Sequence, residues 1–223
     1  MDEERIVRVM ARALARAGLS TAYGHCSMRR AGDERAFLVC APKPMGLIQP
    51  GERGNVVPVD GPLPDQVLGE VRVHQHIYRH RPDITAICRF ISPNILALAA
   101  MGRTPKARHG FGSYFFPQVP IWAGVSLART DAAAAAIANV MAGSPAVVMG
   151  VNGAVTAAET PERALTLAWN LEDAARIELA IIACGMESDA RLLRAEEAKE
   201  RATWAGGVAE RMWAYLTHGD PEA

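Results

Sequence analysis

The chain has 223 residues, half of them hydrophobic, and its 24 basic and 24 acidic residues give a formal net charge of zero. This length fits one domain with a substantial core, and the balanced charge, without a basic block or an acidic tail, argues against a nucleic-acid partner. No apolar run approaches the roughly 20 residues that cross a bilayer, so we expect no membrane partner.

The cysteines and the amino terminus indicate the compartment. The four cysteines are scattered without Cys-x-x-Cys spacing, so we interpret them as reduced, mostly buried thiols and not as a disulfide framework or a zinc site. The first residues, Met-Asp-Glu-Glu-Arg, are acidic and unlike a secretion signal. We therefore expect a cytoplasmic protein.

The first sixty residues predict one helix and three strands. Residues 3–17 carry apolar side chains at helical spacing and are followed by Gly18, which is typical of an amphipathic helix with one buried face. A tight turn at Gly24 then enters a strand, because glycine supplies the backbone freedom such a turn needs. Two further short strands are expected at residues 36–41 and 56–60.

The stretch from Glu70 to Pro93 carries most of the functional prediction. Its pattern predicts a helix, a turn, a strand and the start of another helix. Glu70 and His74 are four residues apart and are expected to share one helical face. The strand that follows holds Arg89 and ends at Ser92-Pro93, where serine is expected to cap a helix that begins at the proline. A carboxylate beside this arginine is a candidate reaction centre; the alternative is a solvated glutamate.

The second half of the chain alternates between helices and strands. A Gly- and aromatic-rich loop at residues 108–117 suits a lid or pocket wall, and it also suits a subunit contact. The other predicted elements are helices at 93–101, 131–142 (capped by Thr130) and 161–185, strands at 146–149 and 154–157, and one or two helices in the tail 189–219.

The pattern Glu-x-x-x-His-x-x-Ile-Tyr at residues 70–78, followed by Arg-Pro-Asp and then a strand ending in Ser-Pro, resembles the class II aldolase/adducin family. The resemblance implies a three-layer α/β/α sandwich around a mainly antiparallel mixed sheet. It implies one such domain at residues 1–187 and leaves a C-terminal helical tail at 188–223. Members of the family are usually homotetramers with sites at subunit interfaces, so a homo-oligomer is expected.

The resemblance also shows which family residues are missing. In that family, His-x-His before Ser-Pro and the histidine of a later Asn-His-Gly turn hold a catalytic divalent metal. This chain carries Arg89, Ile91 and Asn152 at those places. We therefore expect a divergent member without a metal cofactor, the alternative being a divalent metal at a non-standard site.

The retained Glu70 and the new Arg89 lead to a hypothesis for the chemistry. A guanidinium in a dry pocket can stabilise an oxyanion, so Arg89 would bind a small anionic oxo or hydroxy-aromatic acid. Glu70 or His109 would transfer the proton while a carbon–carbon bond breaks, as in a decarboxylase or a retro-aldolase. By the resemblance, or as further polar candidates, the expected substrate-binding residues are His25, Ser27, Lys43, His74, Tyr114, Asn152 and Tyr215.

Two other functions remain open. The lost histidines also fit a non-catalytic, adducin-like oligomeric scaffold or a ligand-binding protein. Simple decay of a site accounts for Ile91 but does not require the charged and polar replacements Arg89 and Asn152. A metal-dependent sugar-phosphate aldolase is disfavoured, because its metal ligands and the hydroxyl-bearing turns that hold a phosphate are missing. Lys43, a lone lysine in the loop 42–46, either meets a substrate carboxylate or is only solvated.

Overall fold

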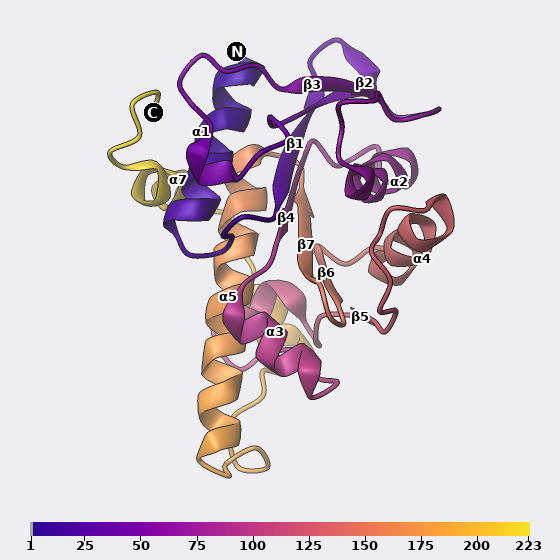
Figure 1. The fold of residues 1–223 in the computed structure, drawn as a ribbon. Coiled ribbons are helices and arrows are strands. Elements are labelled where there is room, and N and C mark those ends of the chain that lie inside the picture. Colours follow the sequence, from indigo (N-terminus) through magenta and orange to yellow (C-terminus); the bar gives the residue numbers. More distant parts are fainter. Residues whose placement is uncertain (1) are drawn as a thin grey trace.

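The structure is a computed structural model that describes residues 2–223, and the chain forms three layers in it (Figure 1). The middle layer is a seven-stranded sheet. Its strands are β1 (His25–Arg30), β2 (Asp33–Val39), β3 (Asn55–Pro58), β4 (Ala86–Phe90), β5 (Ile121–Trp122), β6 (Ala146–Met149) and β7 (Gly153–Ala158).

The sheet has the strand order β3-β2-β1-β4-β7-β6-β5. All neighbouring strands are antiparallel except β5 and β6, which run parallel. β1 and β4 lie side by side near the middle, with His25 directly opposite Arg89. The strand that follows Gly24 and the strand that carries Arg89 therefore meet at one place, where the candidate site forms.

Helices cover both faces of this sheet (Figure 1). Two apolar clusters, one on each face, form the core. One face carries α1 (Glu3–Arg16), α3 (Pro93–Ala100), α5 (Pro161–Ala183) and α7 (Val208–Thr217), the other carries α2 (Arg72–His80) and α4 (Asp131–Met141), and the short α6 (Ala195–Arg201) lies in the tail. The predicted three-layer sandwich with a mainly antiparallel sheet is confirmed.

Polar residues at the helix starts explain several boundaries. The side chains of Asp2, Thr130 and Thr160 accept hydrogen bonds from backbone N–H groups in the first turns of α1, α4 and α5. Ser92 behaves differently from the prediction, since its side chain does not cap its own helix. Its hydroxyl donates to Glu172 Oε2 over 2.6 Å instead.

Glu172, on α5, does the capping that was expected of Ser92. Its carboxylate accepts hydrogen bonds from the backbone N–H groups of Asn94, over 3.0 Å, and Ile95, over 3.2 Å. A carboxylate at a helix N-terminus satisfies free donors and interacts favourably with the helix dipole. The long helix α5 therefore fixes the start of α3, directly after the strand that carries Arg89.

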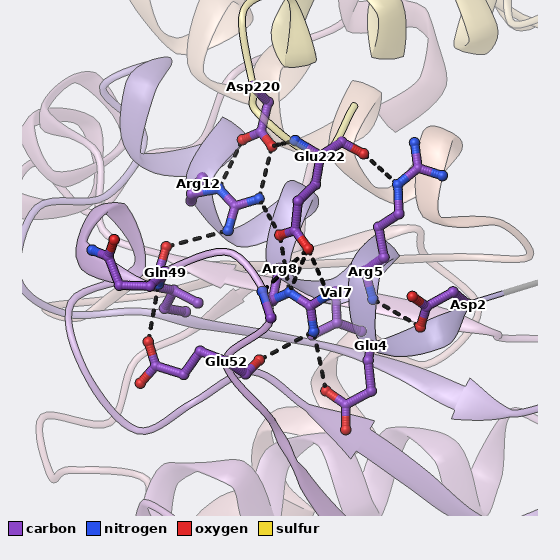
Figure 2. Close-up of polar contacts among 12 residues, drawn as sticks. Asp2, Glu4, Arg5, Val7, Arg8, Arg12, Gln49, Glu52, Asp220 and Glu222 are labelled. Carbon is purple, nitrogen blue, oxygen red and sulfur yellow. Dashed lines mark hydrogen bonds and ion pairs between the residues drawn. The ribbon is translucent and has the colours of Figure 1, made fainter.

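The C-terminal tail is fastened to the first helix (Figures 1 and 2). α7 packs against α1 and α5. Beyond it, Asp220 accepts from Arg12 over 2.7 and 2.8 Å, and Glu222 accepts from Arg8 over 2.7 and 2.9 Å. The division of the chain at residue 187 stays a prediction. Within residues 2–223, no helix combines the length and the apolar character that a membrane crossing requires.

Candidate active site

A cavity of about 350 Å³ opens where β1 begins and β4 ends. His25 and Arg89 contribute the strand residues of its wall, and loops contribute the rest. The lining residues are Ala22, Tyr23, Gly24, His25, Pro42, Lys43, Pro44, Leu68, Glu70, Arg89 and Arg129. A larger cavity, of about 600 Å³, lies between α1 and α7, but its Asp220 is already bound by Arg12 and Arg16.

Arg89 is a buried cation on the wall of the 350 Å³ cavity. Only 5% of the residue is exposed. Its Nη2 donates to Asn152 Oδ1 over 2.8 Å and to the Asn152 carbonyl over 3.3 Å. Within the described residues, its guanidinium forms no ion pair with a carboxylate. Burial lowers the pKa of Arg89 to about 10, so the side chain stays protonated near neutral pH.

The turn between β6 and β7 puts Asn152 in this position. Gly153 follows it with a φ of +83°, a conformation that favours glycine. A Cβ at this position would lie 2.1 Å from the carbonyl oxygen of Phe90. The glycine therefore lets the turn close onto the end of β4, and Asn152 orients Arg89.

Glu70 reaches the cavity from a turn and not from a helix. Residues Gly69–Val71 form a 3₁₀ turn, and α2 begins only at Arg72, so the predicted helical face shared by Glu70 and His74 is wrong. Glu70 Oε1 accepts a hydrogen bond from Arg129 Nε over 2.9 Å, with 14% of the Glu70 side chain exposed. Arg129 was missed from the sequence because it lies 59 residues away and belongs to no motif.

A hydrogen-bonded chain lies behind His25. His25 Nδ1 and His74 Nε2 are 3.0 Å apart, and His74 Nδ1 and Ser27 Oγ are 2.6 Å apart. Ser27 Oγ lies 2.9 Å from the Tyr78 hydroxyl, which donates to the Thr85 carbonyl over 3.2 Å. His25 and Ser27 share one face of β1, while His74 and Tyr78 share one face of α2.

Two residues predicted to bind substrate belong instead to this hydrogen-bonded chain. Ser27 and His74 are fully buried and do not line the cavity, because the core closes over both side chains and their polar atoms bind each other. Burial lowers the pKa of His74 to about 3. Burial also lowers the pKa of His25 well below its usual range, and the positive charge of Arg89 acts in the same direction. Both imidazoles are therefore neutral near pH 7.

Lys43 lines the cavity, but its ammonium is engaged. Its Nζ donates to the two carboxylate oxygens of Glu52 over 2.9 and 3.1 Å. The backbone carbonyl of Glu52 in turn accepts from Arg8 Nη1 over 3.1 Å (Figure 2). The loop that carries Lys43 is thus tied to α1, and the carboxylate of Glu52 balances the charge of the lysine at this side of the cavity.

The structure does not bring His109 to the cavity within one chain. The ring of His109 lies edge-on to Phe111, with ring centroids 6.0 Å apart, and Phe111 lies edge-on to Trp169 of α5. The loop that carries His109 includes the 3₁₀ turn Gly112–Phe115, which packs on α5 and α6. The prediction of His109 as a proton carrier is therefore not supported by the geometry of one chain.

Tyr114 and Tyr215 also lie away from the cavity lining. Tyr114 donates its hydroxyl to the Thr203 carbonyl over 2.6 Å and packs against Trp204. Tyr215 is 73% exposed on α7 and makes no polar side-chain contact among the described residues. In one chain neither hydroxyl contributes to the site with Arg89. The cavity brings together His25, Lys43, Glu70 and Arg89, with Asn152 behind Arg89.

The side chains around Arg89 do not fit a divalent metal. No group of three or more His, Cys, Asp or Glu side chains suited to a metal occurs within residues 2–223. The three positions that carry histidine in the resembling family hold a guanidinium, a hydrocarbon and an amide whose oxygen is bound to Arg89. A cation placed there would be repelled by the fixed charge of the guanidinium, and His25 and Glu70 alone do not make up the three or more ligands of a metal site.

Three comparisons place the chain among known proteins. The profile described as Class II Aldolase and Adducin N-terminal domain matches residues 5–179. A 3,4-dihydroxyphthalate decarboxylase from Rhodococcus jostii (strain RHA1) is 25% identical over 197 residues, which are 78% of this chain and 77% of that protein.

Solved structures with low sequence identity share the fold. An L-fuculose 1-phosphate aldolase from Glaciozyma antarctica PI12 has a TM-score of 0.80 at 18% identity, covering 97% of this chain and 88% of that one. YgbL from Escherichia coli, a putative aldolase/epimerase/decarboxylase, has a TM-score of 0.74 at 19% identity, covering 88% and 96%. Because the family profile matches most of the chain, this protein belongs to the class II aldolase and adducin N-terminal domain family.

Proposed function

We propose that the protein is a metal-independent carbon–carbon lyase that acts on a small anionic hydroxy-aromatic or oxo acid, with decarboxylation as the first reaction to test. Family membership and the decarboxylase relative support a lyase-type enzyme in general. The residues of the cavity support the more specific proposal. Part of the proposal is a cytoplasmic homo-oligomer, with a tetramer expected, in which a neighbouring chain supplies Tyr215.

The observation that carries this proposal is the burial of Arg89 without a carboxylate partner. Only 5% of Arg89 is exposed, and within residues 2–223 its side-chain hydrogen bonds go to the neutral Asn152. The charge of Glu70 acts on Arg89 without direct contact, because the Glu70 carboxylate binds Arg129. A buried charge without a contacting counter-ion is costly, so such residues pair with an anion or serve a function. A carboxylate ligand would provide that anion and match the fork of guanidinium donors.

The same guanidinium can act on the transition state. When a carbon–carbon bond to a carboxylate breaks as CO₂ leaves, its electron pair moves into the remaining ring or carbonyl. An oxyanion that develops there is stabilised by fixed donors, each of which contributes about 3–4 kcal/mol in a site that excludes water. Glu70 accepts from Arg129 at the mouth of the cavity and is the carboxylate that can move a proton there.

Product analysis tests the proposal. Purified protein with excess chelator is incubated with 3,4-dihydroxyphthalate, and released CO₂ is measured; L-fuculose 1-phosphate serves as a retro-aldol substrate. We expect decarboxylation in the presence of chelator. Arg89→Ala should abolish it, and Glu70→Gln should reduce it by roughly 100-fold or more, the usual size of an acid–base contribution.

Matched variants separate chemistry from folding. Arg89→Lys keeps the charge but loses the bidentate donors, so it should retain only part of the activity. Arg103→Ala, at an exposed ion pair with Glu187, should leave turnover unchanged. Full turnover in both Arg89→Ala and Glu70→Gln contradicts the mechanism, and activity that disappears with chelator contradicts metal independence. If neither compound, nor related hydroxy and oxo acids, is converted, the adducin-like scaffold becomes the better explanation.

A further inference from the structure

Only one direction of proton donation satisfies every hydrogen bond in the chain behind His25. The chain consists of Thr85, Tyr78, Ser27, His74 and His25, and its four side chains are all at most 3% exposed. A backbone carbonyl can only accept, so the Tyr78 hydroxyl donates to Thr85. Tyr78 has one proton, and its oxygen must therefore accept from Ser27.

The direction then passes through both imidazole rings. Because Ser27 gives its only proton to Tyr78, its oxygen accepts from a protonated His74 Nδ1. A neutral imidazole with a protonated Nδ1 has a bare Nε2, so His74 Nε2 accepts from His25 Nδ1. His25 Nε2 is left with a lone pair and no proton.

The opposite direction is disfavoured at both ends of the chain. It would leave the contact between Tyr78 and the Thr85 carbonyl without a proton. It would also place an N–H at His25 Nε2, an atom that is buried and has no hydrogen-bond partner in the protein. A buried N–H without an acceptor is rarer and more costly than a lone pair without a donor. The neutral state of both rings is supported by the lowered pKa of each histidine.

We infer that His25 presents a fixed hydrogen-bond acceptor at the cavity wall beside Arg89, so that the site selects a carboxylic acid that also carries a hydroxyl donor. This inference rests on the proposed function and narrows its substrate class to hydroxy-aromatic acids over oxo acids. An oxo group offers only lone pairs, which a bare Nε2 cannot bind. His25 lines the cavity together with Arg89, and the two are direct partners across β1 and β4.

Contact with the ligand hydroxyl requires a small rearrangement. His25 Nε2 is buried, and His25 also borders a second, narrower space with Pro42 and Leu68. Both of these residues line the cavity as well, and Leu68 is 40% exposed. Hydrogen bonds of a site commonly tighten only when the ligand enters. His74, Ser27 and Tyr78 act as positioning residues in this scheme, since none of them lines the cavity and their side chains hydrogen-bond only to one another, His25 and Thr85.

A matched pair of ligands tests the inference. Calorimetry compares 2-hydroxybenzoate with 2-methoxybenzoate, which keeps the carboxylate and the oxygen but lacks the donated proton. We expect the hydroxy compound to bind roughly tenfold more tightly to the wild-type chain, the effect of one hydrogen bond to a buried acceptor. In His25→Asn the preference should disappear, because an amide side chain can both donate and accept.

The positioning residues have a matched control among the tyrosines. Tyr78→Phe removes the acceptor of the Ser27 proton, so Ser27 donates to His74 Nδ1 instead. The direction of donation then reverses and puts the proton on His25 Nε2, so the preference for the hydroxyl should be lost. Tyr114→Phe also removes a hydroxyl that donates to a backbone carbonyl, but outside the chain, and should leave the preference unchanged. Nitrogen-15 spectra of the histidine rings, assigned with His25→Asn, should show protonated Nδ1 and bare Nε2 for His25 in the wild-type chain.

The outcomes separate this inference from the proposed function. A protonated Nε2 in the wild-type spectrum, or equal binding of the two benzoates with CO₂ release intact, overturns the inference and leaves the lyase proposal standing. Failure of both benzoates to bind overturns the inference, and it counts against the proposed function only where CO₂ release from 3,4-dihydroxyphthalate is absent as well. A tenfold preference that vanishes in His25→Asn and Tyr78→Phe but persists in Tyr114→Phe supports the fixed acceptor.

Discussion

Replacement of Asp220 by asparagine tests whether the C-terminal segment stabilises the whole domain. The Asp220 side chain is fully buried and accepts from Arg12, which is 6% exposed, and from Arg16 (Figure 2 shows the pairing with Arg12). Asp220→Asn keeps the shape but removes the charge, and it leaves the buried Arg12 with Glu222 as its remaining carboxylate, over 2.8 Å.

The size of the effect follows from this partial compensation. Removing one partner of a buried ion pair costs about 3–5 kcal/mol. Because Glu222 still pairs with Arg12, we expect a loss near the lower end, about 3 kcal/mol of unfolding free energy. For a chain of this size that corresponds to a fall in Tm of roughly 6–12 °C. Glu187→Gln, at the exposed pair with Arg103, is the control and should cost less than about 1 kcal/mol.

The pH dependence of stability gives an independent measurement. Burial opposes ionisation of Asp220, but hydrogen bonds from Arg12 and Arg16 outweigh it and hold its pKa well below the usual range. Hydrogen bonds from Arg8 likewise lower the pKa of Glu222 to about 2. Since both folded-state values lie below the unfolded ones, this stabilisation is present above about pH 5 and is lost as the pH falls toward 2.

Urea unfolding at pH 7 and pH 3 therefore checks the reasoning. The wild-type chain should lose stability between these values, and Asp220→Asn should lose less of it, because one of the titrating carboxylates is gone. An Asp220→Asn variant as stable as Glu187→Gln at pH 7, or an unchanged acid sensitivity, would refute the claim that the two termini hold each other.

Three further predictions concern the surroundings of Arg89. Gly153→Ala should destabilise the chain by several kcal/mol in urea unfolding, because its Cβ would meet the Phe90 carbonyl at 2.1 Å and φ is positive. Glu172→Gln should cost about 1–2 kcal/mol, measured in the same way, since a neutral amide caps the start of α3 less well than a carboxylate. Asn152→Ala should weaken binding of 2-hydroxybenzoate roughly tenfold in calorimetry and lower Tm by several degrees, because the buried Arg89 loses its orienting acceptor.

Local sequence signals were sufficient for most of the elements. The period of apolar residues and the caps at Thr130 and Thr160 indicate helices whose observed ends lie within about two residues of the predicted ones. The turn at Gly24 and the strand that holds Arg89 were also predictable, and their pairing brings His25 opposite Arg89. Glu70 was misplaced because a short 3₁₀ turn before a helix has the same spacing of polar residues as a first helical turn.

The contacts that finish the site have no local signal. Arg129 binds Glu70 across 59 residues, and Glu172 caps α3 across 77 and 78 residues. Each of these is a single charged side chain on an otherwise ordinary segment, so neither hydrophobic period nor turn chemistry marks it. The same reason explains why His74 was assigned to substrate and not to the chain behind His25. A histidine four residues before a tyrosine on a helix gives no indication of which face the sheet will cover.

Arg89 stands where the family carries a metal-binding histidine, and this replacement limits the chemistry that we expect. A guanidinium carries its charge permanently and has no free coordination position, so it can stabilise an anion through hydrogen bonds but cannot polarise a carbonyl by a direct bond. Cleavage of a sugar phosphate by retro-aldol reaction depends on strong polarisation of a ketone. Decarboxylation of a hydroxy-aromatic acid depends less on it, because the ring itself delocalises the electron pair. Arg89, buried beside the lone pair of His25, therefore suits the second reaction better than the first.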